Sequence, residues 1–114
     1  MITHPELDGP TMLETKEGLR FEAPPEPVDL RLHLRDTALD PEEGEPPRYQ
    51  SCFGTWLWER WRATLEPAGT ERETFMDIVA GYRREVWLWI LGDRTWEQML
   101  SGLAGRVSRR LSVA

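Results

Sequence analysis

The sequence predicts an α+β fold: a three-helix antiparallel unit in the C-terminal half, with a small N-terminal sheet of two or three strands packed on it. Apolar residues recur at three- and four-residue spacing through 51–66, 70–92 and 95–111, as on one face of a helix. Over 28–35, apolar and polar residues alternate instead, which is typical of a strand with one buried face. Short connections separate the helical segments, and such loops usually join antiparallel neighbours.

The segment 70–92 is predicted to be the central helix, because it carries two apolar faces. Thr70 and Glu73 have the spacing of a capping box, and Gly92 is suited to end the helix. The main face consists of Phe75, Ile78, Val79, Tyr82, Val86, Trp89 and Ile90. Of these, we expect Ile78, Val86 and Trp89 to be almost inaccessible to solvent. The second face consists of Met76, Ala80, Trp87 and Leu91.

The helix over 95–111 has a predicted start and an unusual interior. Thr95 and Gln98 form a second capping box at its start. Gly102 and Gly105 lie inside the helix, where glycine costs about 1 kcal/mol relative to alanine. Either the backbone of a neighbouring element approaches these glycines closely, or they mark a weakly specified end of the chain.

The sheet is predicted from two segments of the N-terminal half. Residues 12–22 are expected to form two short strands that turn near Lys16–Gly18, since glycine supplies the positive φ of a tight turn. A proline-rich spacer follows, and then the predicted strand over 28–35. Its buried face would consist of Val28, Leu30, Leu32 and Leu34.

The chain is expected to form one domain, 1–114, in which an acidic, proline-rich segment (1–50) precedes a Trp-rich helical segment (51–114). The first segment carries twelve acidic and five basic side chains and the second eight and nine, so the balances are −7 and +1 and the net charge is −6. This balance disfavours a general nucleic-acid or anionic-membrane role, because phosphate contacts dominate such binding. Residues 1–10 and 40–48 combine charge and proline with few apolar side chains, so we expect them to be mobile.

A cytoplasmic location without membrane association is expected. The single cysteine, Cys52, cannot form an internal disulfide. The chain does not open with a basic and then apolar leader. Its longest apolar run falls far short of the roughly 20 residues that span a bilayer.

No catalytic, cofactor-binding or metal-binding residue is predicted, so we expect a non-enzymatic protein. His33 has no second histidine or cysteine at metal-ligand spacing. Cys52 would need an activating base to act as a nucleophile, and a small buried residue explains it better. Glycine-rich phosphate loops and nucleophile elbows do not occur in the sequence.

Tryptophan is the most conspicuous residue type, with six copies that all lie in the helical half. Large aromatic side chains would build a compact core in a small protein, whereas exposed tryptophan is common at binding hot spots. Trp56 and Trp87 lie off the main apolar stripes of their helices. These two are therefore the tryptophans most suited to contact a partner.

A basic cluster near the C-terminus allows two interpretations. Arg106, Arg109 and Arg110 share one flank of the last helix and could contact phosphates. Cations near a helix C-terminus also offset the helix dipole, and we favour this second interpretation. The stretch 89–111 lacks room for the turn of a helix-turn-helix motif. We therefore expect no DNA or RNA binding tighter than about 10 µM at physiological salt.

Three functions remain open, and the leading one is a small soluble protein-interaction module that self-associates through surplus apolar helix surface. A homodimer is the commonest assembly of this kind, and we expect it to bury Trp87. The alternatives are a small nucleic-acid-associated regulator that uses the arginine flank, and a ligand-binding or enzymatic domain with a Trp-lined pocket. The candidate partner-binding residues are Trp56, Met76, Trp87, Leu91, Arg106, Arg109 and Arg110.

Overall fold

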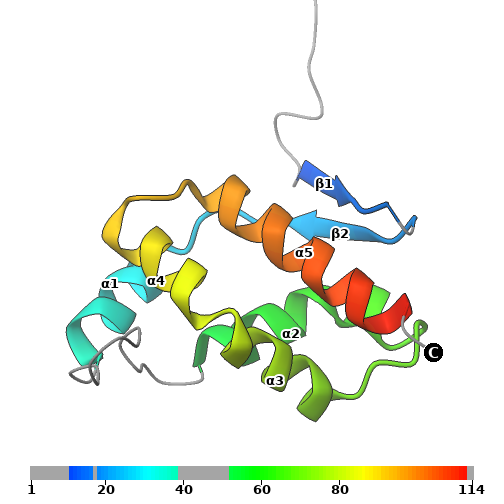
Figure 1. Cartoon of the computed structure of the whole chain (residues 1–114). Coiled ribbons are helices and arrows are strands. Elements are labelled where there is room, and N and C mark those ends of the chain that lie inside the picture. Colours follow the sequence, from blue (N-terminus) through cyan, green and yellow to red (C-terminus); the bar gives the residue numbers. More distant parts are fainter. Residues whose placement is uncertain (1–10, 17, 39–51, 113–114) are drawn as a thin grey trace, which may run out of the picture.

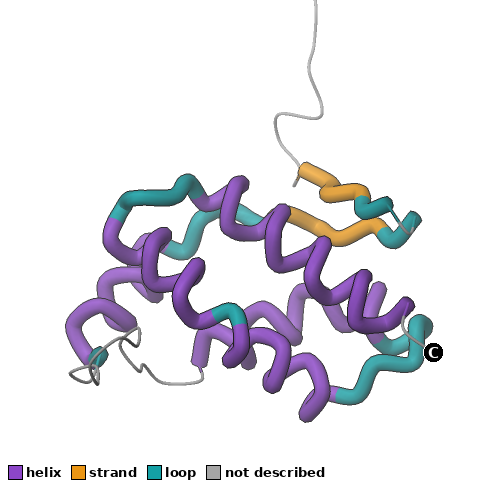
Figure 2. The backbone as a smooth tube through the Cα atoms, in the orientation of Figure 1, coloured by secondary structure: helices purple, strands orange, loops and turns teal. Residues whose placement is uncertain are grey.

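The computed structural model describes residues 11–16, 18–38 and 52–112 (Figure 1, Figure 2). These residues form two strands and five helices, which confirms the α+β class. The elements are β1 (Thr11–Glu14), β2 (Arg20–Ala23), α1 (Val28–Thr37), α2 (Cys52–Leu65), α3 (Arg72–Gly81), α4 (Arg83–Leu91) and α5 (Trp96–Ser112). The segments that we expected to be mobile, 1–10 and 40–48, lie outside the described residues.

The predicted N-terminal hairpin is confirmed, and the sheet has two strands. β1 and β2 pair antiparallel, with Leu13 opposite Phe21. Gly18 lies in the connecting turn with a φ of 83°, a conformation that costs glycine little because it has no Cβ. The Phe21 side chain is fully buried, so the hairpin is attached to the helices through β2.

The predicted strand over 28–35 is wrong, because these residues form helix α1. When apolar residues alternate, every second one lies four positions further along the chain, and this is also the spacing of one helix face. Leu30 and Leu34 are such a pair and face the core, with Leu34 fully buried. Val28 and Leu32 are the other pair and remain 48% and 38% exposed. Leucine also favours helix over strand, so both propensity and packing select the helix.

The predicted continuous helix over 70–92 is also wrong, because the chain bends at Tyr82 between α3 and α4. Tyr82 has φ −100° and ψ 13°, and Gly81 before it is a poor helix former. The buried Tyr82 hydroxyl donates to the Met99 carbonyl of α5 at 3.2 Å, which holds the bend against that helix. The capping box is absent too: α3 starts after Glu71 without a side-chain cap.

Both ends of the connection between α4 and α5 match the prediction. Gly92 ends α4 in the left-handed conformation, with a φ of 91°. The backbone N–H of Gln98 donates to Thr95 Oγ1 at 3.1 Å, and the backbone N–H of Thr95 donates to Gln98 Oε1 at 3.0 Å. These reciprocal bonds satisfy donors that a helix start leaves unpaired.

The glycines of α5 differ in their surroundings. A Cβ at Gly102 would collide with the Tyr82 hydroxyl. The predicted close neighbour therefore exists at this position, but it is a side chain and not a backbone. Gly105 has room, since an added Cβ would meet only the Arg109 side chain at 3.6 Å.

The core lies among α2, α3, α4 and α5, and both halves of the chain contribute to it. Figure 1 shows α3 and α4 following one another along one side, with α5 running back antiparallel to them. Ile78, Val86 and Trp89 are 2%, 0% and 1% exposed, as predicted. Phe21 of β2 and Leu34 of α1 are completely buried in the same cluster, so β2 and α1 of the N-terminal half are an integral part of the fold.

Candidate functional site

The tryptophans divide into a buried set and a peripheral set. The buried set consists of Trp58, Trp61, Trp89 and Trp96. The ring centroids of Trp89 and Trp96 are 4.9 Å apart, within the range of a favourable aromatic pair. The peripheral set, Trp56 and Trp87, is half-buried and packs against the core from outside. These are the two tryptophans that the helical pattern singled out.

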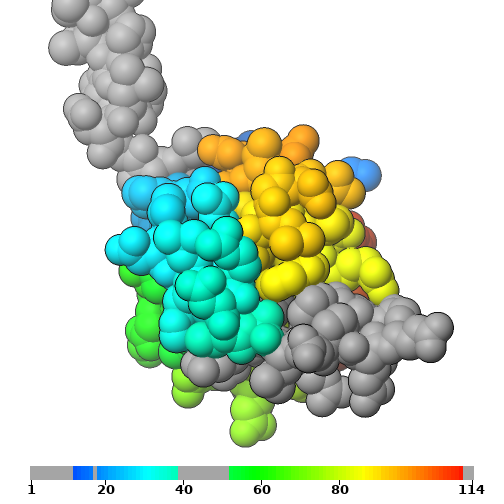
Figure 3. All heavy atoms as spheres, turned by 90° about the vertical axis from the view of Figure 1, so that its left-hand side faces the viewer, coloured from blue at the N-terminus to red at the C-terminus, as the bar shows by residue number. Residues whose placement is uncertain are grey.

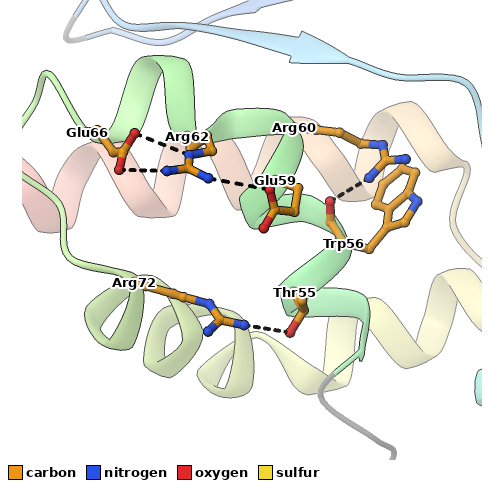
Figure 4. A network of polar contacts seen from close by, with 7 residues as sticks. All are labelled: Thr55, Trp56, Glu59, Arg60, Arg62, Glu66 and Arg72. Carbon is orange, nitrogen blue, oxygen red and sulfur yellow. Dashed lines mark hydrogen bonds and ion pairs between the residues drawn. The ribbon is translucent and has the colours of Figure 1, made fainter.

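Trp56 is covered on one face by its own helix. The guanidinium carbon of Arg60 lies 3.8 Å from the ring centroid, the geometry of a cation–π contact (Figure 4). Arg60 Nη1 also donates to the Trp56 carbonyl at 2.8 Å. The edge of the ring meets Trp96, with centroids 5.9 Å apart. Only part of the Trp56 ring is therefore available to a partner.

Three buried indole N–H groups hold the segment that leads from β2 to α1. A buried indole N–H needs an acceptor, and each of these donates to residues 22–26. The bonds join Trp61 to the Glu22 carbonyl at 2.5 Å, Trp96 to the Pro24 carbonyl at 2.7 Å and Trp89 to the Glu26 carboxylate at 3.2 Å. Much of the tryptophan content thus attaches the proline-rich segment to the helices, which does not favour a Trp-lined ligand pocket.

Side-chain donors of α2 also bind the backbone carbonyls along the outer edge of β2. The Thr15 amide donates to the Leu19 carbonyl at 3.0 Å, and hydrogen-bonded pairs alternate along an antiparallel ladder. The Arg20 and Glu22 carbonyls therefore point away from β1. The Arg20 carbonyl accepts from the Thr64 hydroxyl at 2.7 Å, and α2 covers this edge of β2 with its side-chain donors.

The bend at Tyr82 divides the predicted second apolar face between two helices. Met76 of α3 packs over α2, where a Cβ at Gly54 would lie only 2.9 Å from its sulfur. Trp87 and Leu91 are both on α4 at a four-residue spacing; Trp87 is half-buried and Leu91 is 52% exposed. Met76 therefore belongs to a helix–helix contact, whereas Trp87 and Leu91 share a separate surface.

The large hydrophobic side chains that remain exposed are concentrated on α1 and α4. Among the described residues these are Met12, Val28, Leu32 and Leu91. Three of the four belong to α1 or α4, and these helices pack against each other (Figure 3). We define the α1–α4 face as Val28 and Leu32 of α1 together with Trp87 and Leu91 of α4. Sequence reasoning missed the contribution of α1, because it assigned Val28 and Leu32 to a buried strand face.

A network of charged side chains covers the exposed side of α2 and the start of α3 (Figure 4). Arg62 lies between Glu59 at 3.5 Å and Glu66 at 3.2 Å. The hydrogen bond and the negative charge of Glu66, followed by the charge of Glu59, raise the pKa of the Arg62 guanidinium. Arg72 of α3 donates to the Thr55 hydroxyl at 3.3 Å. All these groups are solvated, and exposed ion pairs of this kind contribute little energy.

A groove of about 730 Å³ adjoins this network at the connection between α2 and α3. Its lining includes Thr70, whose buried hydroxyl has no hydrogen-bond partner among the described residues. Glu59, Glu66 and Glu71 line the groove beside Arg62 and Arg72. The described lining thus mixes three negative with two positive charges, so it does not present a single sign of charge to a ligand.

A second groove, of about 420 Å³, lies between α3 and α5 and has a single sign of charge. It is lined by Ile78 of α3 and by Arg106, Arg109 and Arg110 of α5. The structure thus brings the three predicted arginines together around one concave surface. Arg109 also lines a hollow of about 240 Å³ beside the hairpin, whose lining includes both Glu14 and Lys16.

Two of the groove arginines also act on the buried hydroxyl of Tyr82. Burial is the main cause that raises the pKa of the Tyr82 hydroxyl, and the charge of Glu85 raises it further. The charges of Arg106, Arg94 and Arg109 act in the opposite direction. Three guanidinium groups therefore influence one buried hydroxyl on the flank of α5.

The predicted partner-binding residues thus fall into separate places: Trp56 beside Arg60, Met76 over α2, two residues on the α1–α4 face, and three in the arginine groove. Among the described residues, no group of three or more His, Cys, Asp or Glu side chains is placed to hold a metal ion. The described helices do not include one with the length and apolar character needed to cross a membrane. Comparison with protein families, curated proteins and solved structures finds no match to this chain.

Proposed function

We propose that the protein is a small soluble, non-enzymatic interaction module that self-associates as a homodimer through the α1–α4 face. The observation that carries this proposal is the outward apolar pair on α1. Val28 and Leu32 point away from the buried Leu34 and remain exposed on a helix whose other side already contacts the core. A helix that only covered the core would carry polar residues on its outer side.

The size of a stable interface supports the use of both helices. A standard protein–protein interface buries about 800 Å² on each partner. A ten-residue helix such as α1 is only about 15 Å long and about 10 Å wide, so it cannot supply that area alone. We infer that Leu91 and the half-buried Trp87 supply the remaining area, because they lie on α4, which packs against α1. A two-fold axis near these helices would bring the same patch of each subunit together.

A cytoplasmic location is part of this proposal. The lone cysteine of the sequence suits a reducing compartment, where disulfides rarely persist. The regulator and ligand-pocket alternatives have less support. The chain is acidic overall, and the indole N–H groups of three buried tryptophans already donate to residues 22–26.

The decisive measurement is the mass of the full-length protein in solution at high micromolar concentration. We expect sedimentation equilibrium to give a dimer for the unaltered chain and a monomer for a Leu32→Asp/Leu91→Asp variant. Both side chains are exposed, so their replacement should leave the fold intact by circular dichroism. Met12→Asp is the matched control, because Met12 is 46% exposed but lies on β1, outside the α1–α4 face.

Two outcomes contradict the proposal. The first is a monomer mass for the unaltered protein at that concentration. The second is a dimer that persists in the Leu32→Asp/Leu91→Asp variant. Dissociation in Met12→Asp instead would place the interface on the hairpin.

A further inference from the structure

The three groove arginines differ from most of the other surface arginines in their surroundings. Five arginines outside the groove lie 3.0–3.6 Å from a carboxylate: Arg20, Arg31, Arg35, Arg62 and Arg94. In the described part of the chain, no carboxylate forms an ion pair with Arg106, Arg109 or Arg110. Asp77 precedes Ile78 in α3 but does not line the groove. Three positive charges thus converge without a negative one among the described residues that line the groove.

The helix dipole accounts for only part of this arrangement. Arg109 and Arg110 lie in the last turn of α5, where cations offset the partial negative charge of the helix end. Arg106 lies a turn earlier, outside the reach of that effect. It is separated from the other two by three and four residues, spacings at which like charges on a helix repel one another. Arg106 also has an aromatic partner, since its guanidinium carbon lies 5.8 Å from the Tyr82 ring centroid, within the range of a cation–π contact. Neither this contact nor the helix dipole supplies a counter-charge for all three arginines.

We propose that the groove between α3 and α5 binds the phosphate group of a small phosphorylated ligand through Arg106, Arg109 and Arg110. A guanidinium group presents a planar fork of donors that matches two oxygens of a phosphate. Three such forks can engage the several oxygens of a phosphate dianion, more than a single carboxylate offers. The volume of about 420 Å³ lies within the range of about 300–1,000 Å³ that is common for small-molecule sites. The groove therefore has room for more than the phosphate alone.

The size of the ligand follows from the charge distribution. At physiological salt the screening length is about 8 Å, so a small ligand in the groove experiences mainly the nearby arginines. A long polyanion also approaches the rest of the chain, which carries the net charge of −6. The groove thus favours a compact phosphate compound over nucleic acid. This inference is independent of the proposed dimer, because the groove shares no residue with the α1–α4 face.

The test is isothermal titration of the full-length protein with inorganic pyrophosphate in a buffer without phosphate. We expect saturable binding that weakens at least about tenfold in Arg106→Gln/Arg109→Gln/Arg110→Gln, since charge-assisted bonds to the phosphate are lost. The control, Arg20→Gln/Arg35→Gln/Arg60→Gln, removes the same total charge from exposed positions elsewhere. Its affinity should stay within about twofold of the unaltered protein, because distant surface charges are screened.

A second variant tests the inference without the loss of charge, in case the glutamine variant fails to fold. Arg106→Lys/Arg109→Lys/Arg110→Lys keeps three cations but removes the forked donors. We expect it to bind pyrophosphate at least about threefold more weakly than the arginine protein. An unchanged affinity in the lysine variant would overturn the inference.

Three other outcomes also overturn it. One is the absence of saturable pyrophosphate binding up to about 10 mM. Another is an equal loss of affinity in the groove variant and the control variant, which would indicate only a long-range charge effect. The third is sub-micromolar binding of single-stranded RNA or duplex DNA that falls steeply with salt and is lost in the groove variant. That result would assign the groove to nucleic acid and favour the regulator.

Discussion

Trp96 offers the most direct test of how the tryptophans stabilise this fold. Its side chain is 4% exposed, and its indole N–H donates to the Pro24 carbonyl at 2.7 Å. Trp96→Phe removes this donor and leaves a buried carbonyl unpaired, which costs about 1–3 kcal/mol. The smaller ring leaves a cavity of a few tens of Å³, which adds about 1 kcal/mol at roughly 24 cal/mol per Å³. The free energy of unfolding should therefore fall by about 2–4 kcal/mol.

Urea denaturation followed by far-ultraviolet circular dichroism measures this change. The total stability of a domain of this size is about 5–15 kcal/mol, so the loss is well resolved. Trp56→Phe is the control: the same change is made in a half-buried ring, where we expect a loss below about 1 kcal/mol. The reasoning is refuted if Trp96→Phe costs less than about 1 kcal/mol or no more than Trp56→Phe does.

Three further predictions concern the helices. Gly102→Ala should cost about 1–3 kcal/mol in thermal melts, because its methyl group would displace the Tyr82 hydroxyl from its acceptor. Gly105 has room for a Cβ, so Gly105→Ala should be neutral or stabilising by up to about 1 kcal/mol. Similar losses of stability in Gly102→Ala and Gly105→Ala would contradict the predicted difference between the two sites. Burial raises the pKa of Tyr82 above its ordinary value of 10.0, so the folded state favours the neutral phenol. This stabilising contribution is complete below pH 10 and is lost as the pH rises through the higher folded-state pKa of Tyr82. Tyr82→Phe should remove this pH dependence of stability. Thermal melts between about pH 9 and 11.5 that show the same pH dependence in both proteins would refute the prediction. Val86→Ala should cost about 2–5 kcal/mol in urea, because Val86 is fully buried, and a loss below about 1 kcal/mol would mean that packing around this residue relaxes.

The helical half of the fold could be predicted from the sequence because its signals are local. Apolar spacing, the reciprocal cap of Thr95 and Gln98, and the terminating Gly92 each depend on residues within one or two turns. The buried positions of Ile78, Val86 and Trp89 follow from the same periodicity. The turn at Gly18 has an equally local cause, since its positive φ suits glycine.

The two errors in secondary structure arose where local signals were compatible with more than one answer. Four alternating apolar residues over 28–35 fit one strand face, but they also fit two opposite faces of a helix. Only the packing of Leu34 into the core selects the helix, and it leaves Val28 and Leu32 outside. Gly81 gave a local hint of the bend at Tyr82, but the hydroxyl bond to the Met99 carbonyl joins two separate helices, and no pattern within 70–92 reveals that contact.

The sequence indicated most of the residues of the candidate sites, but not how the packed helices bring them together. The last helix alone showed that Arg106, Arg109 and Arg110 share a flank, because helical spacing is regular. Only the packing of α5 against α3 showed that this flank borders a groove with Ile78. The α1–α4 face could not be derived, since it needs the identity of α1 as a helix and its position beside α4.

The sequence by itself determined the fold class, the helical positions that face the core and the tryptophan-rich composition of that core. Those properties follow from periodicity and amino-acid type, which act over a few residues. Tertiary structure alone decided that three indole N–H groups bind residues 22–26, across 39 to 72 positions of the chain. It also decided which apolar side chains stay exposed. The physical reason is that burial and hydrogen bonding depend on which distant groups meet, and this emerges only when the helices pack.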